Sequence, residues 1–499
     1  MKKFRKALAL VLSMLILLSV SPIAAFAEEK QEEENTVAEA VWYTSYGIKK
    51  GEGTVAEAVA NVKTGGKILL QKDITADAGI TLTVNATIDG AGYTITRSDT
   101  FDGVMFTVAN AAVLTLTNIT IDGNADNYPG QTDAIIAITS GQLNLIKGAV
   151  LTKNSARIIS GGAIKAGPTD ATSTASALII MNDDAQISDC IANNGGAVYL
   201  GYNSKMVMNS GSITNCKASY DGGAVSVATA SSEFTMAGGE IKGCSCSLRD
   251  TGYAGSAVYA GYGITNITGG TITRNTNMSD LGAVYVAQTA TVGIGNTAYI
   301  LGNDGSAAES NIYIEDNAVL NINPAFAEGS KIGVSTSDRF AEGDTVNLDF
   351  INYSGDVMGY IYNDADGSTF YNSNGVITLI QCITVTFDPG NGSCPVKSKL
   401  YPVDVDFGPL PECDEREGFE FLGWYTATDS LVTESTAVSY YEDITLYAKW
   451  ENLNQIDNHP FAFIGRFFER IGELMRSVFH FLENLFTGNG NDELENLPK

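Results

Sequence analysis

The chain has 499 residues, of which 44% are hydrophobic and 17% are charged, with 52 glycines and a formal net charge of −27. This composition favours a folded protein rich in β-strands and turns over a disordered chain. Because the excess of acidic residues repels phosphate groups, we expect no nucleic acid as a partner.

The first 27 residues have the three regions of a secretory signal peptide. Four basic residues within the first six positions precede an apolar run over 7–20, and Ala25 and Ala27 are small residues suited to cleavage. The apolar run is shorter than the roughly 20 residues that a membrane span needs. We predict cleavage before Glu28, which leaves 472 residues with a net charge of −31, and an acidic linker over 28–45.

The middle of the chain repeats one short pattern. Gly161-Gly162-Ala163-Ile164 recurs from positions 195, 222, 255 and 281, in steps of 34, 27, 33 and 26 residues, and a last trace is found at 311–314. Periods of this length indicate stacked units, none of which can bury its apolar face alone. A glycine pair permits a sharp corner, and the alternating residues that follow indicate a strand with one buried face.

A second repeat lies at the corner that follows another short strand of each unit. Its members are Asn154, Cys190, Cys216, Cys244, Asn275 and Asn303. Stacked units would place these residues in one internal ladder. An asparagine amide can bond neighbouring backbone groups there, and a cysteine can pack as a small hydrophobe. We therefore predict unpaired cysteines at this corner, although bridges between stacked neighbours stay open.

The chain has seven cysteines, so at least one thiol of the exported protein should be free if all others pair within the chain. Cys244 and Cys246 are two residues apart, but neither a histidine nor a second cysteine pair accompanies them. A zinc site is therefore not expected. The sequence predicts no metal and no cofactor.

Together these repeats resemble the pectin-lyase-like, right-handed parallel β-helices of bacterial exported proteins, over residues 46–380. Similar proteins begin their β-helix with a short capping helix. The segment Thr54–Ala60 is predicted to be such a cap, followed by the apolar strand Lys67–Leu70. A cap of this kind shields the first turn from edge-to-edge pairing.

Residues 381–452 are predicted to form a second, smaller domain rich in aromatic residues. The segments Val385–Gly392, Gly418–Tyr425 and Ile444–Trp450 closely resemble the Listeria–Bacteroides repeat, also called the internalin B-repeat. The resemblance implies a small β-grasp-like module that serves as a stalk or an interaction unit. The aromatic residues are expected to form its core. Cys394 and Cys413 are a candidate disulfide pair across this module.

The tail, residues 453–499, is predicted to contain an amphipathic helix over 461–486. Three arginines and three glutamates balance on its polar stripe, so it lacks the basic face of a typical membrane-surface helix. Docking onto the protein itself or self-association, and a contact with the cell envelope, are both open.

Catalysis has to be considered because β-helix proteins include polysaccharide lyases and glycoside hydrolases, which use basic residues or paired carboxylates. The two histidines, His459 and His480, both lie outside the predicted β-helix. Asp183 and Asp184 are adjacent and should point apart in a solvated turn. We therefore assign no catalytic residue and favour a binding protein, with a lyase or hydrolase as the alternative.

One outward-facing position is aromatic in four of the repeats. If the valines and isoleucines of each repeat face inward, the alternate positions Tyr199, Tyr259, Tyr285 and Tyr313 face out, stacked about 4.8 Å apart per turn. Aromatic rings flanked by hydroxyl groups suit sugars, so these residues are the candidate ligand-binding site. The competing interpretation is a tyrosine ladder that only stabilises the sheet.

The sequence thus predicts an all-β protein, with a right-handed parallel β-helix, a small β-grasp-like repeat module and a C-terminal amphipathic helix. We expect a secreted or cell-surface, adhesin-like protein that binds an extracellular glycan or a surface protein.

Overall fold

The computed structural model describes residues 37–453 apart from 129–131, 247–253, 307–308, 337–344, 347–350, 353–356, 365–368 and 374–375. These residues form two compact units, divided between Ile380 and Gln381. The predicted signal peptide, and the amphipathic helix predicted over 461–486, lie outside the described residues. Within the described part of the chain, no helix is long and apolar enough to cross a membrane.

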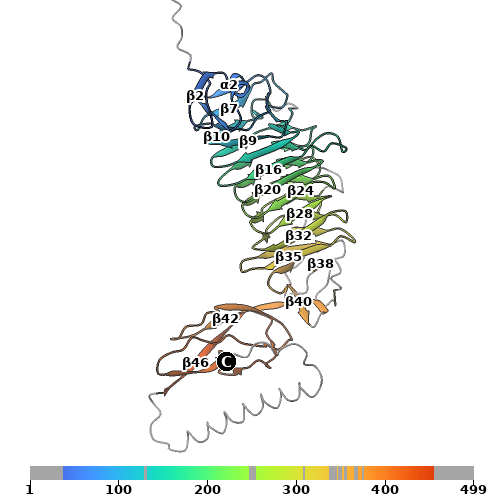
Figure 1. Cartoon of the computed structure of the whole chain (residues 1–499). Coiled ribbons are helices and arrows are strands. Elements are labelled where there is room, and N and C mark those ends of the chain that lie inside the picture. Colours follow the sequence, from blue (N-terminus) through green and yellow to red (C-terminus); the bar gives the residue numbers. More distant parts are fainter. Residues whose placement is uncertain are drawn as a thin grey trace, which may run out of the picture. The chain divides into compact units, whose positions relative to one another are not determined.

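The first unit is a parallel β-helix, as predicted, with about nine turns (Figure 1). Each full turn contributes one strand to each of three ladders, in which neighbouring strands run parallel and in register. This stacking buries the apolar face of each turn against the turns on either side.

The strands of the first ladder are β3 (Gly66–Leu70), β6 (Ala86–Asp89), β9 (Ala112–Thr117), β12 (Gly141–Leu145), β16 (Ala177–Met181), β20 (Ser204–Met208), β24 (Glu233–Met236), β28 (Ile264–Ile267), β32 (Thr291–Asn296), β35 (Leu320–Phe326) and β38 (Ile351–Asn352). Those of the second ladder are β4 (Ile74–Ala76), β7 (Thr94–Arg97), β10 (Ile119–Asp122), β13 (Ala149–Thr152), β17 (Gln186–Ser188), β21 (Ser212–Thr214), β25 (Glu240–Lys242), β29 (Thr271–Thr273) and β33 (Tyr299–Ile300).

Those of the third ladder are β5 (Ile80–Leu82), β8 (Phe106–Val108), β11 (Ile136–Ile138), β15 (Ile164–Ala166), β19 (Val198–Leu200), β23 (Val225–Val227), β27 (Val258–Ala260), β31 (Val284–Val286) and β34 (Ile312–Ile314). The second and third ladders meet in β36 (Lys331–Thr336), which pairs with both β33 and β34. Apart from β38 of the first ladder, the strands of this unit after β36 are β37 (Thr345–Val346), β39 (Ile361–Asn363), β40 (Thr369–Ser373) and β41 (Val376–Ile380). Five two-residue strands line the corner between the second and third ladders: β14 (Ser155–Ala156), β18 (Ile191–Ala192), β22 (Lys217–Ala218), β26 (Ser245–Cys246) and β30 (Thr276–Asn277).

A short helix and a hairpin cover the first turn. The predicted cap is the helix α2 (Val55–Asn61), whose N-cap Thr54 and third residue Glu57 form a reciprocal capping box. Before it, the hairpin of β1 (Ala40–Tyr43) and β2 (Lys49–Gly53) adds antiparallel strands to the edge of β3. The sheet therefore begins at Ala40, inside the segment 28–45 that the sequence analysis assigned to a linker.

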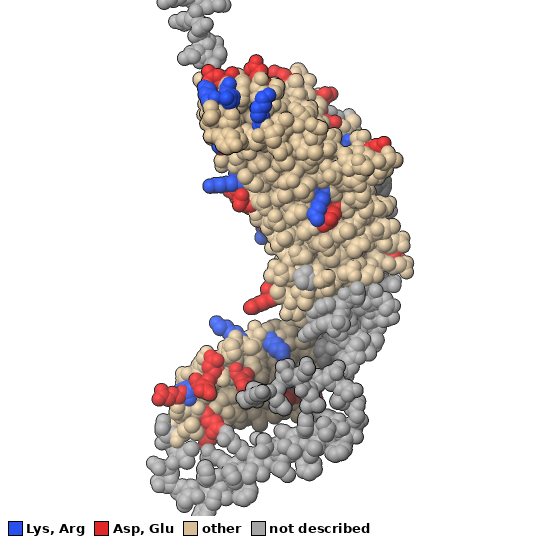
Figure 2. Space-filling view, viewed as in Figure 1, with Lys and Arg blue, Asp and Glu red and all other residues tan. Residues whose placement is uncertain are grey.

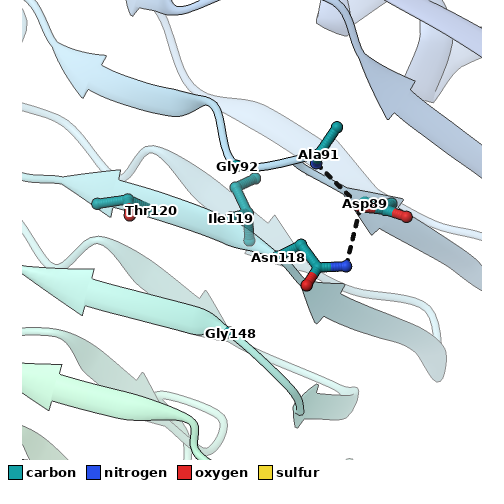
Figure 3. A pocket seen from close by; sticks show the side chains of 7 residues that line it. All are labelled: Asp89, Ala91, Gly92, Asn118, Ile119, Thr120 and Gly148. Atoms are coloured by element: carbon teal, nitrogen blue, oxygen red, sulfur yellow. Dashed lines mark hydrogen bonds between the residues drawn. The ribbon is translucent and has the colours of Figure 1, made fainter.

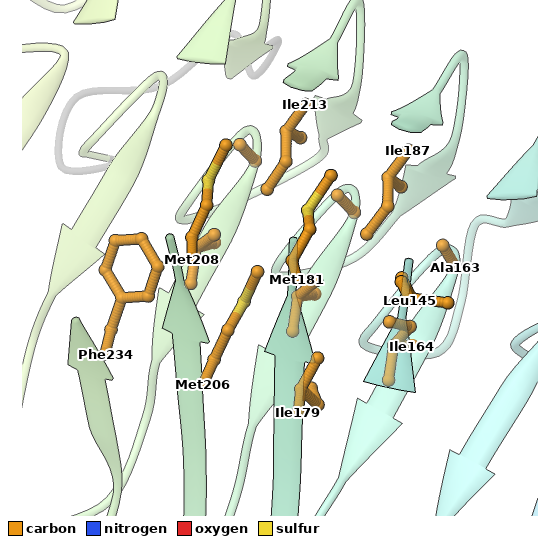
Figure 4. Packing of buried hydrophobic residues seen from close by; sticks show 14 of the residues in the cluster. Leu145, Ala163, Ile164, Ile179, Met181, Ile187, Met206, Met208, Ile213 and Phe234 are labelled. Carbon is orange, nitrogen blue, oxygen red and sulfur yellow. The ribbon is translucent and has the colours of Figure 1, made fainter. Parts of the chain in front are cut away.

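The core consists of columns of apolar side chains that run along the axis of the β-helix, because the register keeps equivalent positions stacked (Figure 4). Two adjacent columns are Leu145, Met181, Met208 and Met236, and Ile179, Met206 and Phe234. All of these side chains are fully buried. Thr265 continues the second column beside Phe234, and its buried hydroxyl has no hydrogen-bond partner among the described residues.

The glycine pairs form the sharp corners that the repeat predicts. The first glycine of each pair is in the left-handed region, for example Gly222 with a φ of 71°. The second has no room for a side chain, since a Cβ added at Gly223 would lie 2.0 Å from the carbonyl oxygen of Ser256 in the next turn. Each pair therefore combines a backbone conformation and a close approach that only glycine allows without strain.

The corner residues form an internal ladder, as predicted, which we call the polar spine. It consists of Asn154, Cys190, Cys216, Cys244, Asn275 and Asn303, and it continues into Asn311 and Asp364. Along the spine, each backbone N–H donates to the side-chain acceptor of the following member. The spine thus satisfies backbone donors that would otherwise be buried without a partner.

The three cysteines of the spine are buried free thiols, as predicted. They also accept hydrogen bonds, a role that the sequence analysis did not assign to them: the backbone N–H of Cys190 donates to the Sγ of Cys216. The Cys190 Sγ–H in turn donates to the carbonyl of Ser188 over 3.2 Å. Burial raises the pKa of the Cys190 and Cys244 thiols well above their usual range, so both stay protonated.

Asp364 ends the polar spine. Its carboxylate accepts hydrogen bonds from the backbone N–H of Asn311 over 2.8 Å and from the Asn311 Nδ2 over 2.6 Å. Burial nevertheless raises the pKa of Asp364 to about 6, and the neighbouring Glu309 adds to the rise. The spine therefore ends on a carboxyl group that binds a proton more readily than an ordinary aspartate does.

The second unit is a five-stranded mixed sheet in the order β43 (Ser398–Pro402), β42 (Cys382–Asp388), β46 (Ile444–Asn452), β44 (Phe419–Tyr425) and β45 (Leu431–Val432). Its first and last strands, β42 and β46, lie side by side and run parallel, which is the β-grasp-like arrangement that was expected. Its core is aromatic, as predicted: Trp424 is 1% exposed and its ring lies 4.8 Å from that of Phe387. Cys394 and Cys413 are neighbouring free thiols and form no disulfide bond.

Candidate functional site

The four tyrosines predicted to face outward lie on one register line of the third ladder. Tyr199 on β19 pairs with Ser226 on β23, which pairs with Tyr259 on β27. The line continues through Tyr285 on β31 and Tyr313 on β34. We call Tyr199, Tyr259, Tyr285 and Tyr313 the tyrosine column. Their neighbours within each strand point into the core, so the alternation of the repeat places them on the outer surface.

The last three rings of the tyrosine column stack on one another. The ring centroids of Tyr259 and Tyr285 are 5.6 Å apart with planes inclined by 19°, and those of Tyr285 and Tyr313 are 5.7 Å apart with planes inclined by 7°. The Tyr285 ring thus has a neighbour on both faces and offers a ligand mainly its edge and hydroxyl group. Ring pairs of this kind also stabilise the ladder by roughly 1 kcal/mol each.

The phenol groups of Tyr199, Tyr259 and Tyr285 remain protonated at neutral pH. Burial, with a smaller effect of the Asp221 carboxylate, raises the pKa of Tyr259 to about 12. Burial also raises the pKa of Tyr285, and Glu315 adds to the rise by its charge and by a hydrogen bond with the phenol group. The column therefore presents phenol oxygens next to two carboxylates, and these oxygens can accept hydrogen bonds from the hydroxyl groups of sugars.

Two further tyrosines lie in the turns just beyond the column, and the sequence analysis did not identify them. Tyr202 and Tyr262 are 37% and 45% exposed, and we call them the turn tyrosines. Both follow a column residue by three positions in the pattern Tyr-x-Gly-Tyr, which is the signal that could have revealed them. A Cβ added at Gly261 would lie 2.2 Å from the Tyr259 ring, so the glycine lets that ring lie against the turn.

One position interrupts the tyrosine column. Ser226 separates Tyr199 from Tyr259, and the equivalent of the turn tyrosines in that repeat is Thr229. Tyr199 and Tyr259 are therefore two turns apart, which corresponds to about 9.6 Å. A ring held between two aromatic faces needs about 7–8 Å, twice the optimal carbon–carbon separation. Since Ser226 is only 2% exposed, the side chains around it would have to part to admit such a ring.

The carboxylate pair considered for catalysis has a structural role. The Asp184 carboxylate accepts the backbone N–H of Gly148 over 2.7 Å, and Asp183 accepts that of Lys147 over 3.3 Å. Both aspartates lie in an exposed turn, as predicted, but their carboxylates do not point apart: both bond the same turn of the preceding repeat. Among the described residues, no group of three or more histidine, cysteine, aspartate or glutamate side chains is arranged to hold a metal ion.

A polar hollow of about 540 Å³ lies at the corner between the first and second ladders, near β6 and β10 (Figure 3). Its acidic residue, Asp89, accepts hydrogen bonds from the backbone N–H of Ala91 and from Asn118, and forms an ion pair of 2.8 Å with Lys67. Although burial opposes the charge, these three partners lower the pKa of Asp89. Its carboxylate is therefore ionised and occupied, unlike that of a general acid.

One face of the β-helix carries few charged side chains. Figure 2 shows one side of this unit as a mostly uncharged surface with isolated basic and acidic side chains. A neutral ligand with many hydroxyl groups can approach such a surface without a large electrostatic penalty. Taken together, the fold and the tyrosine column define a modular β-helix protein with an aromatic outer surface.

Comparison with known proteins identifies the second unit. The model of the Listeria-Bacteroides repeat domain matches residues 384–449, so the chain carries this repeat, as predicted. A protein of Evansella cellulosilytica named "Putative membrane protein" is 41% identical over 78 residues, which cover 14% of this chain and 11% of that protein. The aligned region thus spans about a tenth of that relative's length. No solved structure gives a significant match to the chain.

Proposed function

We propose that this protein is a non-catalytic, surface-associated, adhesin-like protein, in which the β-helix is a shaft and the tyrosine column contacts an extracellular glycan. Three observations support a location outside the cell. The first 27 residues have the regions of a signal peptide, the chain carries a Listeria–Bacteroides repeat, and the aligned relative is named as a membrane protein.

The observation that carries the glycan proposal is the alignment of the tyrosine column with the turn tyrosines. Six tyrosines from four repeats gather along one side of the third ladder. The stacked rings contribute hydroxyl groups and edges, and the exposed turn tyrosines contribute ring surface on which a sugar can stack. Tyrosine is well suited to such contacts because it offers a large amphipathic surface at a low cost in conformational entropy.

The competing explanation is that the column only stabilises the third ladder, and the stacked rings are consistent with it. The turn tyrosines separate the two explanations, because neither belongs to the ladder itself. Substituting them should weaken glycan binding without lowering stability if the column is a binding surface, and should change neither property if it is only structural.

The experiment is a glycan array probed with the purified mature chain, in which soluble products from the same glycans are also measured. Retention without products supports the proposal. Release of reducing sugars or unsaturated products would instead favour a lyase or a hydrolase. If the chain is retained on no glycan and releases no products, glycan binding is contradicted. A surface protein would then be the partner to seek.

The variants Y202S and Y262S should each reduce retention about two- to tenfold on the glycans that bind, because each removes one stacking surface worth roughly 0.5–1.5 kcal/mol. Y299S is the matched control, since Tyr299 is 36% exposed but lies on the second ladder. Equal retention by all three variants and the unmodified chain would refute a role for the turn tyrosines.

A further inference from the structure

The repeat module has a hollow of about 790 Å³ between the segment 413–418 and the strands β44 and β46. This volume is in the range of small-molecule and side-chain binding sites. Its lining combines three aromatic rings with a run of charged residues. The aromatic residues are Phe419, Phe421 and Trp450, and the charged residues are Asp414, Glu415, Arg416, Glu417 and Glu420.

The aromatic part of this hollow already holds one cation, which belongs to the chain itself. The guanidinium carbon of Arg416 lies 3.6 Å from the ring centroid of Phe419 and 5.7 Å from that of Trp450. A tight turn fixes this position, because the backbone N–H of Phe419 donates to the carbonyl of Arg416 over 3.0 Å and Gly418 has a φ of 78°. The faces of the Phe419 and Trp450 rings can therefore attract a planar cation such as a guanidinium group.

The charges around the aromatic rings do not balance. Four carboxylates and one guanidinium line the hollow, which leaves an excess of three negative charges. Asp414, Glu415 and Glu417 are exposed, and within the described part of the chain none of the three forms an ion pair. Their field extends about 8–10 Å at physiological ionic strength, so a second cation would be drawn towards the rings.

We propose that this hollow binds the basic side chain of a partner peptide, an arginine or a lysine, which stacks on the aromatic rings beside or in place of Arg416. An organic cation fits better than a metal ion, since aromatic faces recognise guanidinium and ammonium groups. A peptide fits better than a free amine, because the exposed Leu453 extends the lining with apolar surface for the peptide backbone and neighbouring side chains.

The test is a titration of fluorescein-labelled Gly-Arg-Arg-Gly with the mature chain, followed by fluorescence polarisation. The matched probe is Gly-citrulline-citrulline-Gly, which keeps the shape of arginine but has no charge. We expect the arginine probe to bind at least tenfold more tightly. The variant F419L keeps an apolar side chain but loses the aromatic ring, and should weaken binding of the arginine probe about two- to fivefold. Equal binding of the two probes, or no effect of F419L, would overturn the proposal.

A second pair of variants distinguishes this pocket from the general negative field of the module. R416Q removes the resident cation, whereas K449Q removes the same charge from Lys449, which lies 4.2 Å from the ring centroid of Tyr425 outside the hollow. Both variants should tighten binding of the arginine probe, and the affinity of R416Q should be at least three times that of K449Q. Equal effects would show that only net charge matters and would contradict a specific site.

The chain's own tail is the competing occupant, because it follows Leu453 directly and carries Arg466 and Arg470. If the double variant R466Q/R470Q binds the arginine probe more tightly, the tail is the resident ligand and the assignment to an external partner is wrong. Unchanged binding supports the external partner. Glycan retention is measured on the same variants, so failure of this proposal is distinguished from failure of the tyrosine column.

Discussion

Replacement of Asn275 by alanine would remove one member of the polar spine and should destabilise the β-helix locally. The Asn275 Oδ1 accepts the backbone N–H of Cys244 over 2.9 Å, and its Nδ2 donates to the carbonyl of Ile241 over 3.1 Å and to Oδ1 of Asn303 over 2.9 Å. Asn275 is fully buried, so water cannot replace these bonds.

The cost of N275A follows from these contacts. The buried N–H of Cys244 loses its acceptor, which costs about 1–3 kcal/mol, and the carbonyl of Ile241 loses a donor worth roughly 1 kcal/mol. We therefore expect a loss of about 2–4 kcal/mol. N275C is the matched control, because a cysteine Sγ already accepts the equivalent N–H at three positions of the spine. The loss in free energy of unfolding caused by N275C should be less than about half of the loss caused by N275A.

The assay is urea unfolding of the mature chain, combined with amide hydrogen exchange of the segment 241–246. In N275A the Cys244 amide should exchange faster by a factor of 30 or more, since about 2 kcal/mol of local protection is lost. If N275A costs less than 1 kcal/mol, or if N275C is as destabilising as N275A, the acceptor role assigned to the spine is refuted.

Three further outcomes follow from the core. T265V should raise stability by about 1–2 kcal/mol, because it removes a buried hydroxyl without a partner; a lower urea midpoint would contradict this. G223A should lower stability by at least 2 kcal/mol, because its Cβ would lie 2.0 Å from the Ser256 carbonyl oxygen; an unchanged midpoint would show that the corner relaxes. The pKa of Asp364 is raised to about 6 by folding, so its protonated form is the one that folding favours. Its contribution of about 2–3 kcal/mol should be present below pH 4 and lost as the pH rises through about 6, and D364N should abolish this dependence; parallel urea midpoints of both chains from pH 4 to 7 would contradict it.

The part of the fold that repeats could be predicted from the sequence because each repeat fixes its own register. The corner at Gly222 and Gly223 and the alternation after it determine which side chains point inward, and so place Tyr259 above Ser226. The same logic placed the spine cysteines in one ladder. The strand β1 was missed because it is an edge strand whose pairing depends on a hairpin rather than on the repeat.

The remaining features depend on contacts between turns, which sequence spacing does not determine. The stacked geometry of Tyr285 and Tyr313 requires particular side-chain rotamers. The spine ends on Asp364, which is 53 residues beyond Asn311 and follows no repeat. The hollow beside Phe419 arises from a tight turn that brings a charged segment over an aromatic strand, and neither motif alone predicts it.

Glycan binding by the tyrosine column is tested most directly by the retention of the double variant Y259S/Y285S on the glycans that bind the unmodified chain. The measurement is made at a temperature at which circular dichroism shows the variant to be folded, with Y299S as the control. If the column binds the glycan, Y259S/Y285S should lose retention and Y299S should keep it. Unchanged retention by Y259S/Y285S, or an equal loss in Y299S, would contradict the claim and leave the column as a stabilising ladder.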